Sequence, residues 1–463
     1  MKTISQLIAC LLFVACSTTY ADNPTKIQGD ESQTAKRVLM DSIEFDTVEG
    51  RGKVPALAAY YAEFLEKAGF SKEDIEILPF GETATLAATM KGKTSEKPLL
   101  LIAHLDVVEA DPADWERDPF TAIEEDGYIF GRGSLDNKFG IAMQITALAK
   151  LKREGYQPRQ DIILVLSGDE ETTQKSTEML AAKYRHAGLV INSDSGGGAR
   201  DANGTPLYYV IQAAEKSYSD FQLEFTDPGG HSSRPSEPTA ITRLANALAK
   251  IGAHYFAPQR SELTIEALKG ISSQVDPELG DAMRRFIDDP DDAEALALIR
   301  SKPSYIGQIG TTCVTTTIEA GHAVNALPQR ATANINCRIF PGIPAKDVLE
   351  ELATVIDDPN GKLTISWDPL VTDPSPLSDD VMNAVKAAVH KNHPELPVFP
   401  GMGVGTTDSI LFRAQGVPSY GVGGLFIRSQ DMYAHGLNER VPVDAIPAAL
   451  SHWDHLIRAL TGE

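Results

Sequence analysis

The segment LLLIAHLDVV, residues 99–108, decides the fold that this sequence predicts. Its apolar run from Leu99 to Ala103 is continuous rather than alternating, which is typical of a strand buried on both faces of a parallel sheet. Two polar residues, His104 and Asp106, follow directly where the strand is expected to end. Because side chains from distant parts of a chain meet at the carboxyl ends of parallel strands, a functional site is expected there.

Acidic residues and histidines recur beside apolar runs elsewhere in the chain. They occur in DIILVLSGDEE (161–171) with Glu170 and Glu171, in LVINSDSGGG (189–198) with Asp194, in GRGSLDNK (131–138) with Asp136 before a helix, and in YAHGLNERV (433–441) with His435. Imidazole nitrogen and carboxylate oxygen are ligands that zinc takes in proteins, and two neighbouring ions need a carboxylate to bridge them. If these residues were only solvated surface groups, several charges would stand unpaired beside buried strands, which is costly. The sequence therefore predicts a two-metal hydrolase site.

Neighbouring residues in this set are expected to have different roles. The strand period of two points His104 and Asp106 the same way, so the aspartate carboxylate should accept the second N–H of the imidazole. Glu170 and Glu171 diverge, so one can bind metal while the other acts as a general base.

Helical and strand patterns alternate from about residue 33 to 213, which predicts an α/β domain with a mostly parallel sheet and helices on both faces. Near Ala214 the pattern changes to that of a small α+β domain inserted into the first, and the chain returns near Asp373. An acidic, alanine-rich stretch between Pro258 and Pro303 is expected to be a solvated helical insertion on this second domain.

Eight segments, in order, resemble the M20 family of zinc peptidases and amidohydrolases. They are HLDVV (104–108), GRGSLDNK (131–138), SGDEE (167–171), NSDSG (192–196), GGHSSRP (229–235), the stretch from NALP (325–328) to NCR (336–338), GVGTTD (403–408) and AHGLNE (434–439). The resemblance implies a catalytic di-zinc domain formed by residues 22–213 and 373–463, and an inserted lid or dimerisation domain at 214–372.

The resemblance also implies roles for individual residues. The metal ligands would be Asp136 as the bridge between two Zn²⁺, with His104 and Asp194 completing one site and Glu171 and His435 the other, and Co²⁺ or Mn²⁺ able to substitute. The other roles are Glu170 as general base, Asp106 orienting His104, His231 at the oxyanion, Asn325 and Arg338 lining the substrate pocket, and Gly405 and Thr406 on a loop that contacts substrate. Because the family histidine commonly reaches into a partner's active site, the resemblance implies a homodimer through the lid. Larger lids in the family can substitute for a partner, so a monomer in which His231 acts within its own subunit is the alternative.

The expected activity is hydrolysis of an amide bond next to a free carboxylate, in a small peptide or an N-acyl amino acid, by a carboxypeptidase, dipeptidase or amidohydrolase. An aminopeptidase that binds a free amino terminus is an alternative, disfavoured by Arg338, which suits an anion. A catalytically silent peptide-binding protein is another, disfavoured by retention of Glu170. The net charge of -22 excludes nucleic acid as a partner, since that requires basic surface.

The first residues predict export to the periplasm or beyond. Lys2 precedes a short apolar run and small residues, which is typical of a signal peptide, residues 1–21. Cleavage before Asp22 gives a soluble protein, whereas cleavage at Cys16 would give a membrane-anchored lipoprotein. Cys313 and Cys337 lie at equal distances from Asn325 on two strand-like runs. They are expected to form either a disulfide, if the runs pair as a hairpin, or two buried thiols.

Overall fold

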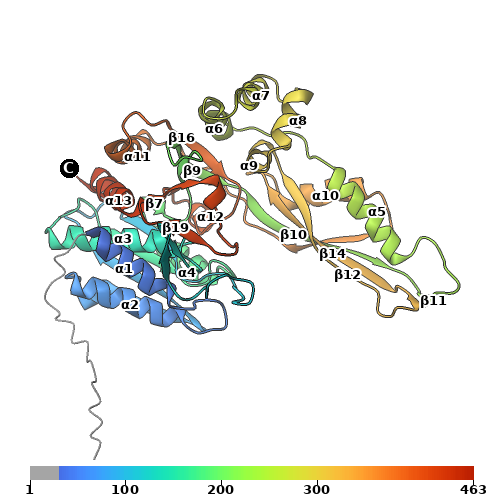
Figure 1. Ribbon diagram of the computed structural model, residues 1–463, viewed down its shortest axis with the longest axis horizontal. Helices are drawn as coiled ribbons and strands as arrows, with labels where there is room; N and C mark the ends of the chain where they lie inside the picture. The colour runs from blue at the N-terminus through green and yellow to red at the C-terminus, as the bar shows by residue number, and fades with distance from the viewer. Residues whose placement is uncertain (1–30, 463) are drawn as a thin grey trace, which may run out of the picture.

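The computed structural model describes residues 31–462. The predicted signal peptide and Cys16 therefore lie outside the described residues. The protein has two lobes, an α/β lobe and an elongated lobe that extends away from it (Figure 1). No helix between residues 31 and 462 has the length and apolar character needed to cross a bilayer.

The α/β lobe is built on a ten-stranded sheet. Its order is β1 (Ile75–Phe80), β2 (Thr83–Met90), β6 (Ile162–Ser167), β3 (Leu99–His104), β7 (Leu189–Asn192), β17 (Ser419–Gly421), β9 (Pro206–Glu215), β8 (Gly197–Arg200) and β18 (Phe426–Arg428), with β16 (Val398–Gly403) also pairing with β9. The central strands β6, β3, β7 and β17 run parallel, as the sequence predicts, while β1, β2 and the β8–β9 and β9–β17 pairs are antiparallel.

Helices cover both faces of this sheet, which explains the continuous apolar run of β3. Leu99, Leu101 and Ala103 pack into the core on one face, and Leu100 and Ile102 pack into the core on the other. The first face is covered by α1 (Glu31–Ile43), α2 (Val54–Lys67), α3 (Lys138–Arg153), α11 (Asp379–Asn392) and α13 (Ala445–Thr461), and the second by α4 (Lys175–Lys183) and α12 (Ser409–Ala414).

The elongated lobe carries a four-stranded antiparallel sheet. Its order is β12 (Thr312–Ala320), β14 (Arg330–Ile339), β10 (Ser217–Thr226) and β15 (Lys362–Trp367), with α5 (Ala240–Ala253) and α10 (Ala345–Ile356) packed on it. A two-stranded ribbon of β11 (Gly230–His231) and β13 (Ala326–Leu327) lies at its far end (Figure 1). The chain crosses from the large sheet to this one at Lys216, between β9 and β10.

The acidic stretch after Pro258 forms helices that do not simply face solvent. They are α6 (Glu262–Ser272), α7 (Pro277–Asp288), α8 (Ala293–Arg300) and α9 (Pro303–Ile306), followed by the 3₁₀ turn Gly307–Ile309. Their apolar faces form a core with Phe399 of β16 and with Tyr208 and Val210 of β9. This part of the insertion therefore packs against the large sheet. The sequence predicted a solvated helical insertion, but the helices bury their apolar faces on β9 and β16.

A small three-stranded sheet brings two distant site segments together. It consists of β19 (Arg440–Pro442), β5 (Tyr128–Phe130) and β4 (Ile123–Glu125). The 3₁₀ turns Lys72–Asp74 and Ser429–Asp431 complete the regular structure. Because β5 leads into residues 131–138 and β19 follows residues 433–439, pairing of Arg440 with Phe130 sets the segment of Asp136 beside that of His435.

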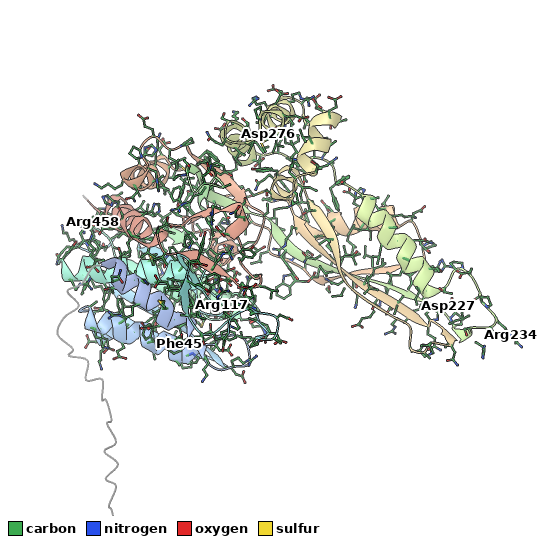
Figure 2. All side chains as sticks on the ribbon, viewed as in Figure 1. Phe45, Arg117, Asp227, Arg234, Asp276 and Arg458 are labelled. Atoms are coloured by element: carbon green, nitrogen blue, oxygen red, sulfur yellow. A yellow bond between two sulfur atoms is a disulfide. The ribbon has the colours of Figure 1, made fainter. Side chains whose placement is uncertain are left out.

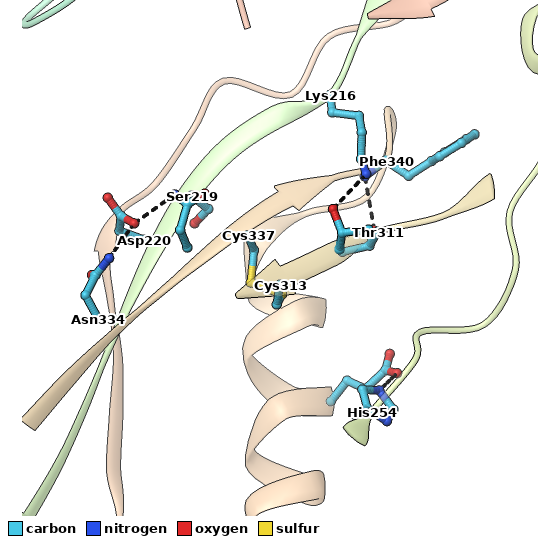
Figure 3. Close-up of a disulfide and its surroundings, with 12 residues drawn as sticks. Lys216, Ser219, Asp220, His254, Thr311, Cys313, Asn334, Cys337 and Phe340 are labelled. Atoms are coloured by element: carbon cyan, nitrogen blue, oxygen red, sulfur yellow. Dashed lines mark hydrogen bonds and ion pairs between the residues drawn. A yellow bond between two sulfur atoms is a disulfide. The ribbon is translucent and has the colours of Figure 1, made fainter. Parts of the chain in front are cut away.

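Of the two alternatives for Cys313 and Cys337, the structure has the disulfide. The two residues are register partners on β12 and β14, and their Cα atoms are 4.1 Å apart (Figure 3). The bond closes a hairpin with a sequence separation of 24 residues. It therefore joins the edge strand β12 to the inner strand β14 of the four-stranded sheet.

Candidate active site

The site lies at the carboxyl ends of the parallel strands. His104 is the last residue of β3, Glu170 and Glu171 follow β6, and Asp194 follows β7. Since β3 pairs in parallel with both β6 and β7, these ends are adjacent. Metal-binding atoms of His104, Asp136 and Glu171 lie within 4.8 Å of one another.

Asp136 lies between two imidazole rings. Its Oδ1 is 2.9 Å from Nε2 of His104, and its Oδ2 is 3.3 Å from Nε2 of His435. Each histidine also faces a second carboxylate. Nε2 of His104 is 3.5 Å from Asp194 Oδ1, and Nε2 of His435 is 3.1 Å from Glu171 Oε1. The five predicted ligands thus form two groups that share Asp136.

A hydrogen bond of His104 determines which of its two ring nitrogens is free to bind a metal ion. Nδ1 lies 3.0 Å from the backbone carbonyl oxygen of Asp106, which can only accept, so Nδ1 carries a proton. In the neutral ring Nε2 is then a bare lone pair, directed at oxygens of Asp136 and Asp194. Three lone pairs that converge on one point require a cation between them, so the donor set fits a metal ion.

The pKa values of these groups reflect the crowding of carboxylates at the cluster. Burial, followed by the charge of Asp136, raises the pKa of Asp194 to about 8. Hydrogen bonds to Asp136 and Glu171 raise the pKa of His435 to about 10. Although burial opposes it, hydrogen bonds from His104 and His435 hold the pKa of Asp136 below its usual range. The cluster therefore favours bound positive charge, which a proton or a metal ion can supply.

Asp106 contacts the turn of the two glutamates as well as His104, the residue that the strand period predicts it to face. Its carboxylate accepts the backbone N–H groups of Glu170 at 3.1 Å and Glu171 at 3.0 Å. The carboxylate Oδ1 is 3.6 Å from Nδ1 of His104, so the carbonyl of Asp106 is the closer acceptor. Asp106 thereby contacts His104 through its backbone and holds the turn of the two glutamates through its side chain.

Glu170 is enclosed at the side of the metal cluster. Its side chain is buried, and Gln174 donates a hydrogen bond to its Oε1 at 3.1 Å. Burial raises the pKa of Glu170 well above its usual range, the charge of His104 opposes that rise, and Asp408 and Asp194 add to it. A carboxylate with a raised pKa is a stronger base, as proton abstraction from water requires.

Glu439 organises the segment that carries Asp136, a role that the sequence analysis did not assign to it. Its carboxylate accepts the backbone N–H groups of Gly133, Leu135 and Asp136 at 3.2, 2.7 and 3.0 Å. Arg132 binds the same carboxylate at 2.6 Å, and both side chains are buried. The only sequence signal is that Glu439 lies within the AHGLNE segment, close to His435.

A second buried network of hydrogen bonds ends at the backbone N–H of Asp194. Glu215 accepts from Arg413 at 2.6 Å and from the Thr407 hydroxyl at 2.9 Å. Asn192 donates to that hydroxyl at 3.2 Å, and its own Oδ1 accepts the backbone N–H of Asp194 at 2.8 Å. No motif in the sequence indicated this connection.

The predicted substrate-binding residues fall into two groups. Arg338, on β14, lies over the ring of Tyr218 at 4.9 Å. Burial lowers the pKa of its guanidinium, and the charges of Tyr218, Asp220 and Glu170 oppose that shift. Thr406 donates to the carbonyl of Lys216 at 2.9 Å, which ties the loop of Gly405 and Thr406 to the crossing between the sheets.

His231 and Asn325 lie at the other end of the elongated lobe. Both are exposed, and the N–H of Ser232 donates to the carbonyl of Asn325 at 3.2 Å, so the two loops are in contact. Figure 2 labels Asp227 and Arg234, on either side of His231, at the tip farthest from the α/β lobe. Within one subunit the structure therefore does not bring His231 and Asn325 to the metal cluster or to Arg338.

Comparison with known proteins relates most of the chain to one family of hydrolases. The model of peptidase family M20/M25/M40 matches residues 100–459. An N-fatty-acyl-amino acid synthase/hydrolase, PM20D1 of Xenopus tropicalis, is 29% identical over 457 residues, covering 94% of this chain and 87% of the relative.

Two solved structures share the fold. The M20 family metallo-carboxypeptidase Sso-CP2 of Sulfolobus solfataricus superposes with a TM-score of 0.68 at 21% identity, covering 93% of this chain and 99% of that one. Human carnosine dipeptidase 1 superposes with a TM-score of 0.68 at 17% identity, covering 93% and 96% of the two chains.

Proposed function

The chain belongs to peptidase family M20/M25/M40, and we propose from this premise that it hydrolyses an amide bond adjacent to a free carboxylate, in a small peptide or an N-acyl amino acid. The protein is an M20 hydrolase, and proteins that resemble it are named as an N-fatty-acyl-amino acid synthase/hydrolase, a metallo-carboxypeptidase and a dipeptidase. The observation that carries the proposal is the position of Asp136 between His104 and His435, with the buried base Glu170 beside the cluster.

Members of this family are metal dependent, and the proposed cofactor is a pair of Zn²⁺ ions, for which Co²⁺ or Mn²⁺ can substitute. His104, Asp136 and Asp194 would hold one ion, and Glu171, Asp136 and His435 the other. The mix of imidazole and carboxylate donors suits zinc, and Asp136 has one oxygen directed to each group. Bound zinc supplies Lewis acidity, which polarises a carbonyl and lowers the pKa of water.

Glu170 is the proposed proton carrier. In its carboxylate form it takes a proton from the attacking water, and it returns that proton to the nitrogen of the leaving amine. Gln174 holds Oε1 by a hydrogen bond, and Asp106 fixes the backbone at Glu170, so the carboxylate is positioned before substrate binds. Preorganisation of this kind lowers the cost of reaching the transition state.

Arg338 is the proposed anchor for the substrate carboxylate, and its position favours this reading over an aminopeptidase. The guanidinium is partly buried, stacks on Tyr218, and has no salt bridge within the described residues 31–462. A half-desolvated cation of this kind binds a carboxylate strongly, whereas it would repel a free amino terminus. The loop of Gly405 and Thr406 would complete this subsite.

His231 and Asn325 act in trans in this proposal. Their place at the far tip of the elongated lobe leaves them outside the metal cluster of their own subunit. A homodimer formed through this lobe would deliver them to the partner's site, where His231 would donate a hydrogen bond to the developing oxyanion and Asn325 would contact the substrate.

Export to the periplasm or the cell exterior completes the proposal, either as a soluble protein or anchored through Cys16. The Cys313–Cys337 disulfide supports it, because disulfides persist in oxidising compartments.

The test is release of amino acids from a panel of dipeptides and N-acyl amino acids, each with a free and an amidated carboxyl end, with and without added zinc. Zinc-dependent cleavage confined to the free acids is the expected result. Equal cleavage of the amidated forms would assign an aminopeptidase-like specificity, and absence of cleavage in both sets with metal bound would refute the proposal.

A further inference from the structure

The four-stranded sheet of the elongated lobe has one face that its helices do not cover. The core beneath α5 and α10 takes alternate residues of the two inner strands, namely Phe221 and Leu223 of β10 and Ala333, Ile335 and Cys337 of β14. Because neighbouring residues of a strand point to opposite faces, the residues that alternate with these face away from the helices. They include Tyr218, Asp220, Asn334, Asn336 and Arg338.

The strand register gives Arg338 two neighbours on this face. It sets Arg338 directly opposite Tyr218, and it sets Asn336 directly opposite Asp220. The guanidinium Cζ of Arg338 lies 4.9 Å from the centre of the Tyr218 ring. Asp220 is the diagonal neighbour of Arg338, a separation that a long side chain can span. Within residues 31–462, Arg338 nevertheless contacts the ring and forms no ion pair with Asp220.

Three hydrogen bonds engage the carboxylate of Asp220. Its Oδ1 accepts from the side-chain amides of Asn334 and Asn336, both at 2.9 Å, and its Oδ2 accepts from the hydroxyl of Tyr218 (Figure 3 shows the contact with Asn334). Although burial opposes it, these hydrogen bonds lower the pKa of Asp220, so the carboxylate is ionised and can only accept. Burial, followed by the bond to Asp220, raises the pKa of Tyr218 to about 12, so the phenol is the donor.

We propose that Tyr218 and Asp220 are positioning residues for the substrate-carboxylate anchor. The Tyr218 ring holds the guanidinium of Arg338, and Asp220 holds that ring through its hydroxyl. Because an aromatic face attracts the cation without pairing its N–H groups, the guanidinium keeps them for a bidentate grip on the substrate. An ion pair with Asp220 would occupy the same N–H groups, and the hydrogen bonds from Tyr218, Asn334 and Asn336 oppose it. This assignment rests on the proposed function, in which Arg338 binds the carboxylate of the amino acid.

Steady-state kinetics of Tyr218→Phe test the role of the hydroxyl. The substrate is the free acid that wild type cleaves with the highest kcat/KM in the panel of dipeptides and N-acyl amino acids, and its carboxamide serves as a competing inhibitor. The variant keeps the ring but releases one oxygen of Asp220, which can then pair with Arg338. KM for the free acid should rise about 5- to 30-fold, while kcat, zinc content and the affinity for the carboxamide stay unchanged. Equal weakening of the free acid and the carboxamide would mean a general structural role and would overturn the proposal.

A second substitution should rescue the first. Asp220→Asn removes the charge that competes for Arg338, so KM of Tyr218→Phe/Asp220→Asn should lie below that of Tyr218→Phe. Two independent structural defects would add instead, and a KM in the double variant as high as in Tyr218→Phe, or higher, would overturn the proposal. Gln222→Ala is the matched control, since Gln222 is the next residue along this face of β10 and is exposed. Its KM should equal that of wild type, and a rise as large as in Tyr218→Phe would assign the effect to the whole face and contradict the proposal.

A crystal structure of Tyr218→Phe supplies a readout that does not depend on turnover. The guanidinium of Arg338 should form an ion pair with the carboxylate of Asp220, and a guanidinium that stays on the ring at position 218 would overturn the proposal. The wild-type protein separates this inference from the proposed function. Equal cleavage of free acids and carboxamides by wild type would refute the proposed function and the anchor together. A free-acid preference in wild type that Tyr218→Phe leaves unchanged would refute the positioning role alone.

Discussion

The carboxylate of Glu439 accepts the backbone N–H of Asp136 at 3.0 Å, and so a residue that binds no metal holds the proposed bridging ligand in place. The same carboxylate binds Leu135 and the buried Arg132. Asp136 therefore owes its position between the two histidines to a residue about 300 positions later in the chain.

Replacement of Glu439 should weaken metal binding without removing a ligand. In Glu439→Gln one oxygen becomes an NH₂ group, which cannot accept the N–H groups, and the charge that pairs with Arg132 is lost. We expect zinc affinity to fall about 10- to 100-fold, the usual effect of removing a group that orients a ligand. Competition with a chelator measures this. Glu178→Gln, an exposed position on α4, is the control, and an unchanged zinc affinity in Glu439→Gln would show that Asp136 is held by other contacts.

Glu170→Gln should separate proton transfer from metal binding. The amide keeps the shape of the side chain but cannot take a proton, so kcat should fall by about 10²- to 10⁴-fold while both zinc ions stay bound. Asp136→Ala should lose zinc as well as activity. Metal content by elemental analysis, measured beside kcat, distinguishes the two. Near wild-type kcat in Glu170→Gln would remove this residue from the mechanism.

The sequence predicted the parts of this site that depend on strand ends. The apolar runs before His104, Glu170 and Asp194 identify neighbouring parallel strands, and their ends converge as expected. The sequence could not show which oxygen of Asp106 lies nearest to His104. Whether the carbonyl or the carboxylate is closer depends on the local backbone conformation, which the residue pattern does not determine.

Other features were not predictable because their partners lie far away in the sequence. Glu439 reaches the Asp136 segment only through the pairing of β5 with β19, two strands of three residues each. Likewise, the helices after Pro258 pack on Phe399, more than a hundred residues later in the chain. Local periodicity identifies an apolar face but does not identify what covers it.

Loss of the disulfide should destabilise the elongated lobe and spare the metal site. The cross-link between Cys313 and Cys337 closes a loop with a separation of 24 residues, so its removal should lower the free energy of unfolding by about 2–4 kcal/mol. Urea unfolding of the Cys313→Ser/Cys337→Ser protein measures this, with zinc content as the control. Equal stability with and without the bond would mean that the strand pairing of β12 alone holds this edge.

Lys216 should make stability depend on pH between about 7 and 10. Burial, followed by the charge of Arg338, lowers its pKa to about 7 in the folded protein, whereas an unfolded lysine titrates near about 10.4. In this window the unfolded chain binds the extra proton, so stability rises with pH, and below pH 7 the cost of burying the charge is fully present. The free energy of unfolding of Lys216→Met minus that of wild type should therefore be largest below pH 7 and should decrease toward pH 10.

Unfolding curves at several pH values measure the difference in stability between Lys216→Met and wild type. Groups that titrate in the same way in both proteins do not contribute to this difference. Lys269→Met, at an exposed position on α6, is the control and should show no such trend. A pH-independent difference for Lys216→Met would mean that its Nζ, bound to the carbonyl of Gly310 at 2.7 Å, keeps an ordinary pKa.

Complementation between inactive variants should reveal whether the far tip acts in a partner subunit. His231→Ala removes the tip histidine, and Glu170→Gln removes the base, so each homodimer should be inactive. If His231 acts in trans, a mixed dimer has one site with both residues intact and one site with neither. Refolding equal amounts together makes half the dimers mixed, so activity should recover to about a quarter of wild type. If His231 acts within its own subunit, every site in every dimer lacks one residue, and mixing should restore nothing.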